Sequence, residues 1–190
     1  YQGKATQTVT PGASTVTNAM LAGSIANAKL ANSSITLNSS AVSLGGSHTI
    51  TTTPFFLANK TAAQTLSSGA NTKVIGLADV YDTSSTFADN KFTPAVAGYY
   101  YLEGTTSINI ANAGKYLQAM IYKNGSLISY SQIVAEGTNN TYTVSVSVVD
   151  LADTDDYYEL YIRQNTGGDV TINYDNNAKY TRFLGYKLIT

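Results

Sequence analysis

The residues that could do chemistry are concentrated in one short acidic stretch. Its carboxylates could act as the paired acids of a glycoside hydrolase or as ligands for Ca2+, because a hard cation needs several oxygens close together. They are Asp150, Asp153, Asp155, Asp156 and Glu159. The stretch lacks the ligand spacing of an EF-hand loop, and no apolar surroundings that would raise the pKa of one acid are visible. We therefore predict a solvated turn whose like charges repel one another weakly, with a calcium site as the alternative.

Other reactive side chains are scarce. The chain has no cysteine, which excludes disulfides and thiol chemistry. His48 is the only histidine, and a serine–histidine–acid arrangement would have to recruit it from the N-terminal segment. A second oxygen-rich group could hold a cation or form an ordinary polar loop. It consists of Asp169, Asp175, Asn176 and Asn177. We predict no enzymatic activity, no cofactor and no metal site.

The composition favours a binding surface. Only 12% of the residues are charged and the net charge is −1, so nothing attracts nucleic acid or an anionic membrane electrostatically. No apolar run approaches the roughly 20 residues that span a membrane. The 15 tyrosines accompany abundant Ser, Thr and Asn, as on antibody combining surfaces. The alternative is a β-rich protein that simply uses tyrosine in its strands.

Strand periodicity sorts these tyrosines. Residues 99–110 alternate like a long, half-buried strand of aromatic, β-branched and threonine side chains. Tyr100 falls on the apolar face and is predicted to lie in the core, whereas Tyr99 and Tyr101 fall on the other face. Outward rings can pack at a subunit interface or stack on sugars, and we expect an interface for these two. Further outward tyrosines are Tyr130 and Tyr174.

The elements that position these residues form an all-β domain. Short extended segments alternate with turns rich in Gly, Asn and Asp, and Asn124-Gly125 between two apolar runs is a strong hairpin signal. The pattern predicts an eight-stranded antiparallel jelly-roll sandwich over residues 63–190, with an immunoglobulin-like sandwich as the alternative. The predicted strands are residues 63–66 with 73–81, 86–92, 99–110, 115–123, 127–135, 142–151, 157–163 and 180–189.

Residues 1–52 differ from the rest, because they contain no acidic residue and a single aromatic one, Tyr1. Such a segment cannot bury a core of its own. The pattern of residues 18–22 recurs at 27–31, as in repeats that assemble with copies of themselves. Short strands are predicted at 35–37, 41–44 and 49–51. We expect a linker over residues 53–62, and a chain that starts at Tyr1 suggests a fragment of a longer protein.

Two stretches carry family resemblances. The run SIANAKLANSSITLNSSAVSLGGSHTI resembles the shaft repeats that precede the tip of phage tail fibres, and the similarity covers residues 16–52. That resemblance implies an intertwined, homotrimeric fibre shaft over residues 1–52. Residues 63–190 resemble the trimeric globular heads of the tumour-necrosis-factor and complement-C1q type. The matching residues are Phe92, Gly98, Tyr100, Leu102, the hairpin Lys123-Asn124-Gly125, Phe183 and Gly185.

One motif of the second family is only half present. Its Gly-Asp pair before the seventh strand is represented by Asp156 alone, with Asp155 where glycine is usual. We therefore expect that this turn differs in shape from the family pattern while the fold is kept. The resemblance implies a trimeric jelly-roll head.

Strand parity predicts where a partner meets the head. Loops after odd strands gather at one end of an antiparallel jelly roll, and loops after even strands gather at the other. We call the end at which the chain enters the base, and the opposite end the tip. Predicted tip loops are 82–85, 111–114, 136–140 and 167–179, and predicted base loops are 94–98, 124–125 and 152–156. Because loops on a rigid scaffold often carry binding, the tip supplies the predicted ligand-binding residues: Asn112, Asn139, Asn140, Asp169, Asn173, Tyr174, Asp175, Asn176, Asn177 and Lys179.

The sequence thus predicts an extracellular attachment protein of a virion, the trimeric tip of a tail fibre that binds a host-surface receptor, most naturally a glycan. It involves neither nucleic acid nor membrane insertion. The first alternative is a secreted, trimeric C1q-like adhesin or ligand of a cellular organism. Such proteins more often carry a collagen stalk of Gly-X-Y repeats, which is absent here. The second alternative is a fibre-borne polysaccharide depolymerase.

Overall fold

The structure is a computed structural model that describes residues 12–13, 30–37, 40–48, 53–174 and 180–188. The chain divides into two compact units, Tyr1–Thr51 and Thr52–Thr190. The regular elements found in the described residues are all β-strands. Within those residues, no helix is long and apolar enough to cross a membrane.

The described part of the N-terminal unit contains one β-hairpin. Strand β1 (Ser34–Leu37) pairs antiparallel with β2 (Ser40–Ser43), with Ile35 opposite Val42. These strands confirm the extended segments predicted at 35–37 and 41–44. Large apolar side chains of this unit, including Ile35, are exposed in the single chain, and an isolated two-stranded hairpin is marginally stable at best. The predicted repeat over residues 18–31 and the predicted strand at 49–51 lie largely outside the described residues.

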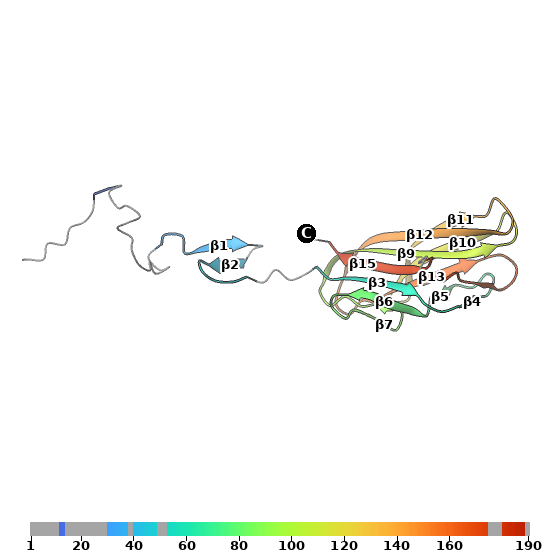
Figure 1. Ribbon diagram of the computed structural model, residues 1–190, viewed down its shortest axis with the longest axis horizontal. Helices are drawn as coiled ribbons and strands as arrows, with labels where there is room; N and C mark the ends of the chain where they lie inside the picture. The colour runs from blue at the N-terminus through green and yellow to red at the C-terminus, as the bar shows by residue number, and fades with distance from the viewer. Residues whose placement is uncertain (1–11, 14–29, 38–39, 49–52, 175–179, 189–190) are drawn as a thin grey trace, which may run out of the picture. The chain divides into compact units, whose positions relative to one another are not determined.

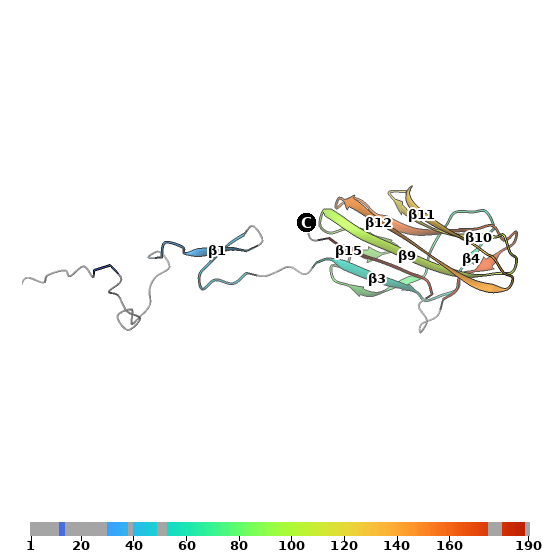
Figure 2. The same ribbon diagram turned by 90° about the horizontal axis from the view of Figure 1, so that it is seen from above.

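The C-terminal unit is built from two antiparallel sheets. The β9 sheet has the strand order β12-β9-β15-β3-β6, which can be followed in Figure 1, and the β10 sheet has the order β11-β10-β13-β8-β7, with β5 also on β13. A small sheet pairs β4 (Thr65–Leu66) with β14 (Val170–Thr171). The remaining strands are β3 (Phe55–Lys60), β5 (Thr72–Lys73), β6 (Leu77–Asp82), β7 (Phe87–Ala88), β8 (Lys91–Phe92), β9 (Gly98–Ile110), β10 (Tyr116–Lys123), β11 (Ser126–Val134), β12 (Asn140–Ala152), β13 (Tyr158–Gln164) and β15 (Arg182–Lys187). Figure 2 shows the same strands after a turn of 90°.

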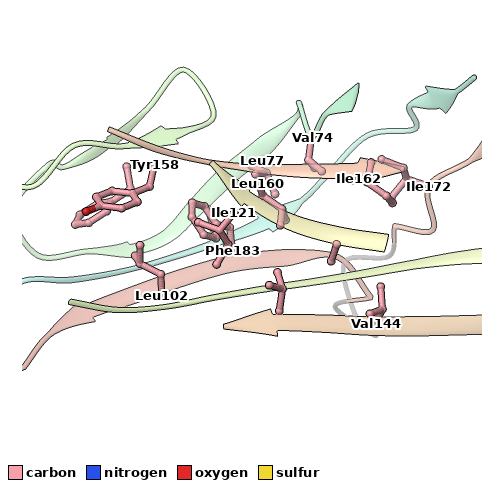
Figure 3. Close-up of a cluster of buried hydrophobic side chains, with 14 of the residues drawn as sticks. Val74, Leu77, Leu102, Ile121, Val144, Tyr158, Leu160, Ile162, Ile172 and Phe183 are labelled. Carbon is pink, nitrogen blue, oxygen red and sulfur yellow. The ribbon is translucent and has the colours of Figure 1, made fainter. Parts of the chain in front are cut away.

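The core lies between the two sheets. Tyr100, Leu102 and Ile108 of β9 are fully buried, as the alternation predicts, but Thr105 and Ser107 of the opposite face are buried as well. Side chains from both sheets meet in Figure 3, for example Leu102 and Phe183 from the β9 sheet and Leu160 from the β10 sheet. An aromatic cluster closes one part of the core, where the ring of Phe56 stacks on that of Phe92 with centroids 4.5 Å apart. Stacked rings add to the free energy gained by burying their apolar area.

Two glycines allow the side chains of the core to approach the backbone of the β9 sheet. A Cβ atom on Gly104 would lie 2.2 Å from Cδ1 of Leu160. A Cβ atom on Gly185 would lie 2.4 Å from Cδ2 of Leu102 and 2.8 Å from the ring of Phe56. Glycine at these positions is therefore required by packing, and Gly185 is the residue that the closing-strand motif singled out.

The structure corrects two of the predicted elements. Residues 53–62, predicted as a linker, contain strand β3, which pairs with β15 on one side and with β6 on the other. The predicted strand over residues 86–92 is a tight hairpin of β7 and β8. Its turn residues Asp89 and Asn90 have φ values of 52° and 59°, a conformation that asparagine and aspartate adopt more readily than most residues.

Candidate functional site

The antiparallel pairing fixes which loops share an end of the C-terminal unit. The base contains Pro54, whose carbonyl accepts a hydrogen bond from Lys187 N at 2.9 Å. Strand β9 runs antiparallel to β15, so Gly98 also lies at the base and Ile110 lies toward the tip. The predicted base loops 94–98, 124–125 and 152–156 are all found there. Asn124 N, for example, donates to Tyr157 O at 3.0 Å, next to the last strand residues of β12.

Three of the predicted tip loops do lie together. Loop 111–114 is bound to loop 136–140 by hydrogen bonds from Asn139 N to Ala111 O (3.3 Å) and from Gly114 N to Ala135 O (2.7 Å). The described part of the third loop, residues 167–174, starts beyond Gln164 at the tip end of β13 and crosses to β9 through an Ile108–Ile172 bridge. The three loops therefore share the tip end of the unit, and the first two are in direct contact.

The fourth predicted tip loop, 82–85, lies at the base instead. Thr83 N donates to Phe55 O at 3.1 Å, and Phe55 N donates to Thr83 Oγ1 at 3.0 Å. The error has a simple origin, because the unrecognised strand β3 reverses the direction of everything that follows it. The unrecognised reversal between β7 and β8 then restores the original direction. The loops from β9 onward were therefore placed correctly, while loop 82–85 was not.

The predicted ligand-binding residues differ in their exposure, and some lie outside the described part of the chain. Asn112, Asn139, Asn140 and Asp169 are exposed at the tip, and Asn139 has a positive φ of 55°. Tyr174 exposes 45% of its surface. The other four, Asp175, Asn176, Asn177 and Lys179, lie outside the described residues. Of the predicted residues, the described ones therefore offer amides, one carboxylate and one aromatic ring, and Glu136 of loop 136–140 adds a second exposed carboxylate.

The side chain and backbone of Asn173 are used in hydrogen bonds within the domain. Its Nδ2 donates to Ser107 Oγ at 3.1 Å and lies 3.4 Å from Asn109 Oδ1. Its backbone N donates to Ser107 O at 2.8 Å, and its carbonyl accepts from Thr181 Oγ1 at 2.9 Å. These bonds pin the long loop to β9, so Asn173 acts as an anchor that presents the neighbouring ring of Tyr174.

The acidic stretch at the base is an ion-pair network. Lys123 Nζ lies 2.7 Å from Asp150 Oδ2 and 3.0 Å from Asp156 Oδ2. Burial alone would lower the pKa of Lys123, but the hydrogen bonds to these two carboxylates outweigh burial and raise it. Glu159 pairs separately with Lys73 at 2.7 Å. The prediction of a solvated, self-repelling turn is therefore wrong for these three acids, which have cationic partners.

The same network shows what the sequence analysis missed. The hairpin residue Asn124 has a φ of 51° and donates from Nδ2 to Asp156 Oδ1 at 2.7 Å. The buried Tyr158 donates its hydroxyl to Asp150 Oδ2 at 2.6 Å, and burial together with this bond raises the pKa of the phenol. No group of three or more His, Cys, Asp or Glu side chains suited to a metal ion is found among the described residues. The Lys-Asn-Gly hairpin was the available signal, since its cation and amide both face the turn before β13.

The outward face of the β9 sheet carries a group of apolar and aromatic side chains. Tyr101 and Tyr186 are paired across β9 and β15 with ring centroids 5.2 Å apart. Around them lie further exposed apolar or aromatic side chains, which with these two we call the aromatic face. They are Phe55, Tyr81, Tyr99, Val149 and Leu151. Exposed patches of this kind mark interaction surfaces, and both Tyr99 and Tyr101 belong to it.

Comparison with known proteins identifies the fold of the C-terminal unit. No family model matches the chain, and no curated protein matches it in sequence. Among solved structures, the globular domain of zebrafish complement 1qA is 16% identical, with a TM-score of 0.50 over 72% of this chain and 98% of that one. Eiger TNF from S. frugiperda is 8% identical with a TM-score of 0.55 over 72% and 93% of the two chains. Murine APRIL at pH 5.0 is 11% identical with a TM-score of 0.55 over 72% and 100%. The C-terminal unit therefore has the C1q/TNF-like jelly-roll fold, as the motifs predicted.

Proposed function

We propose that this chain is the distal end of a phage tail fibre, a homotrimeric attachment protein whose jelly-roll head binds a glycan on the host surface. The observation that carries the attachment role is the tip surface, where loops 111–114 and 136–140 share one end of the unit with the loop that presents Tyr174. Exposed amides and one accessible ring are the groups with which proteins hold sugar hydroxyls and stack on sugar rings. The assignment to a fibre is supported by the resemblance of residues 16–52 to shaft repeats.

The aromatic face supports assembly into a trimer. A large apolar patch on one sheet is stabilised when it packs against copies of itself. Exposed Ile35 and Leu37 in the N-terminal hairpin also favour assembly, because the hairpin gains little stability alone. Three tips around one axis would convert individually weak glycan contacts into firm attachment.

The test is a binding assay with the purified trimer. Fluorescent protein is screened against a panel of bacterial cells and against glycans released from their surfaces. We expect Tyr174→Ala to lower attachment to the cells that bind wild type, while light scattering still reports a trimer. Asp153→Ala at the base is the matched control and is expected to bind normally. Full attachment by Tyr174→Ala together with variants of the other tip loops would refute the tip assignment.

A secreted C1q-like ligand or adhesin of a cellular organism is the second candidate. The observation in its favour is the structural likeness to the animal proteins named above. Screening distinguishes the two candidates, because this alternative predicts binding to a cellular protein and none to bacterial glycans. For the depolymerase alternative, a reducing-sugar assay on the bound glycan decides, and we expect no release of reducing ends.

A further inference from the structure

A shallow hollow lies on the outward face of the β10 sheet, outside the tip loops. Its volume is about 200 Å³, below the roughly 300–1,000 Å³ of pockets for drug-sized ligands. It is lined by Asn71, Gln118, Met120, Leu127, Tyr130 and Arg163. The aromatic face belongs to the other sheet, on the opposite side of the core. The hollow therefore stays open when copies of the chain pack through the aromatic face.

Strand register explains why these side chains meet. Met120 of β10 is opposite Tyr130 of β11, and Gln118 of β10 is opposite Arg163 of β13. Directly opposed residues in a sheet point to the same side. Met120 is only 3% exposed and forms an apolar floor, whereas Tyr130 is 61% exposed and stands beside it. The arrangement presents the face of one aromatic ring next to one cation.

Arg163 has no ion-pair partner among the described residues of the domain. Its Nε atom is shielded from solvent without a hydrogen-bond acceptor. Among the described residues, no ion pair includes Arg163, and none of those lining the hollow is acidic. The nearby cation Lys73, by contrast, is paired with Glu159 at 2.7 Å. A partly desolvated guanidinium without a counter-charge favours an anionic group, which it can hold through two parallel hydrogen bonds.

Two amides complete the polar rim. Gln118 Nε2 donates to Gln132 Oε1 at 2.9 Å, and Asn71 Nδ2 donates to Tyr122 Oη at 2.9 Å. These two surface hydrogen bonds orient both amides and engage their NH2 groups. The carbonyl oxygens of Gln118 and Asn71 are then free to accept hydrogen bonds from hydroxyl groups of a ligand.

We propose that this hollow binds one acidic sugar residue, a pyranose ring that carries a carboxylate. The apolar face of the ring packs on Tyr130, the carboxylate meets the guanidinium of Arg163, and ring hydroxyls donate to the amides of Gln118 and Asn71. The site is lateral and separate from the tip, so it goes beyond the proposed attachment through the tip loops. A fibre head with both sites would contact an acidic polysaccharide along its flank as well as at its end.

The experiment measures binding of single sugars to the purified full chain by saturation-transfer NMR and chemical-shift titration. The probes are D-glucuronate and N-acetylneuraminate, with D-glucose as the neutral partner of glucuronate. We expect millimolar binding of at least one acidic sugar, and binding of glucose weaker than that of glucuronate by about fivefold or more. Tyr130→Ala should abolish the signal, while Arg163→Gln should bring glucuronate down to the level of glucose.

The controls separate this site from the rest of the molecule. Tyr99→Ala removes an exposed ring from the opposite sheet and should leave sugar binding unchanged. Tyr174→Ala tests the tip independently, so attachment to cells can fail while sugar binding persists, or the reverse. If neither acidic sugar binds, or if binding survives Tyr130→Ala, the proposal is wrong. Equal binding of glucose and glucuronate to the wild type would also overturn it.

Discussion

Lys123 Nζ lies 3.0 Å from Asp156 Oδ2, which ties the hairpin after β10 to the turn before β13. The same ammonium reaches Asp150 and the carbonyl of Leu151 at 2.8 Å. It thereby joins both sheets at the base, because β10 and β12 belong to opposite layers. The acidic stretch that suggested a calcium site in the sequence is thus part of an ion-pair network in which one lysine connects the two sheets.

Removing this lysine should destabilise the domain. In Lys123→Met the carboxylates of Asp150 and Asp156 lose their partner in a site where both ion pairs are largely shielded from solvent. We expect a loss of about 2 kcal/mol in the free energy of unfolding, as for other half-buried pairs whose partner is left behind. Urea unfolding of both proteins measures it. Lys115→Met, a change at the tip, is the control and should cost less than about 0.5 kcal/mol.

The loss of folding stability at acid pH should depend on Asp156. The backbone N–H of Asp153 and the Lys123 ammonium hold the pKa of Asp156 below its usual value. Its stabilising contribution is therefore complete above the unfolded-state pKa near 3.8 and is lost as the pH falls through the folded-state pKa. Melting temperatures of wild type and Asp156→Asn, recorded from pH 6 to pH 2, should converge at the acid end. A constant difference over that range would contradict the assignment.

A buried lysine at the other end of β3 should add a second rise of stability with pH, this time in the alkaline range. Lys60 is 2% exposed and donates to Gln64 Oε1 and to the carbonyl of Ile75, and no ion pair of Lys60 is found among the described residues. Burial lowers its pKa to about 8 from the usual 10.5. Between these values the unfolded state binds more protons, so stability should rise with pH, by at most about 1.4 kcal/mol per pH unit.

Comparison of wild type with Lys60→Met between pH 7.5 and pH 9.5 isolates this effect. The variant should lose the rise, because it removes the one group among the described residues whose folded-state pKa burial places in that interval. The range stops below the ordinary tyrosine pKa near 10, above which the many phenols begin to ionise. Lys115→Met should keep the wild-type slope. A parallel rise in Lys60→Met and wild type would show that another group is responsible.

Core side chains that lie close to the backbone at Gly104 and Gly185 predict that a larger residue at either position destabilises the domain. Gly185→Ala places a Cβ atom against Leu102, Phe56 and the carbonyl of Tyr101, so backbone and ring atoms must move. We expect a destabilisation of about 2–3 kcal/mol, typical of an overpacked core. Gly168→Ala is the matched control, because a Cβ atom there has no neighbour within 4 Å. Thermal unfolding should show a clear drop for the first variant and almost none for the second.

Much of the fold was predictable because local signals agreed with the final structure. The strict alternation around Tyr100 identified β9, and Asn124-Gly125 identified a turn whose φ values are 51° and 78°. Strand β3 was not predicted, because its sequence has no alternation of period two. Asn59 and Lys60 are polar residues that are buried beside apolar ones. The identity of such a strand depends on neighbours that lie far away in the sequence.

The candidate sites were predictable only in part. Loop parity follows from the number of strands, so the tip could be predicted for residues such as Asn112 and Tyr174. The hollow could not, because it joins Asn71, Gln118 and Arg163 from a loop and two strands whose register no local pattern reveals. Arg163 alone resembles any outward residue of a strand. That Arg163 has no acidic partner among the described residues becomes visible only when the strands are placed in register.

The last prediction concerns assembly through the aromatic face. The side chain of Leu151 is 57% exposed and is not part of the core. We therefore expect Leu151→Arg to fold normally. If the aromatic face is covered in the trimer, a charge buried there costs several kcal/mol without a partner, and the variant should become monomeric. Val134→Arg, an equally simple change on the outward face of β11, should remain trimeric. Light scattering measures both, together with circular dichroism to confirm folding, and a trimeric Leu151→Arg would place the subunit contact elsewhere.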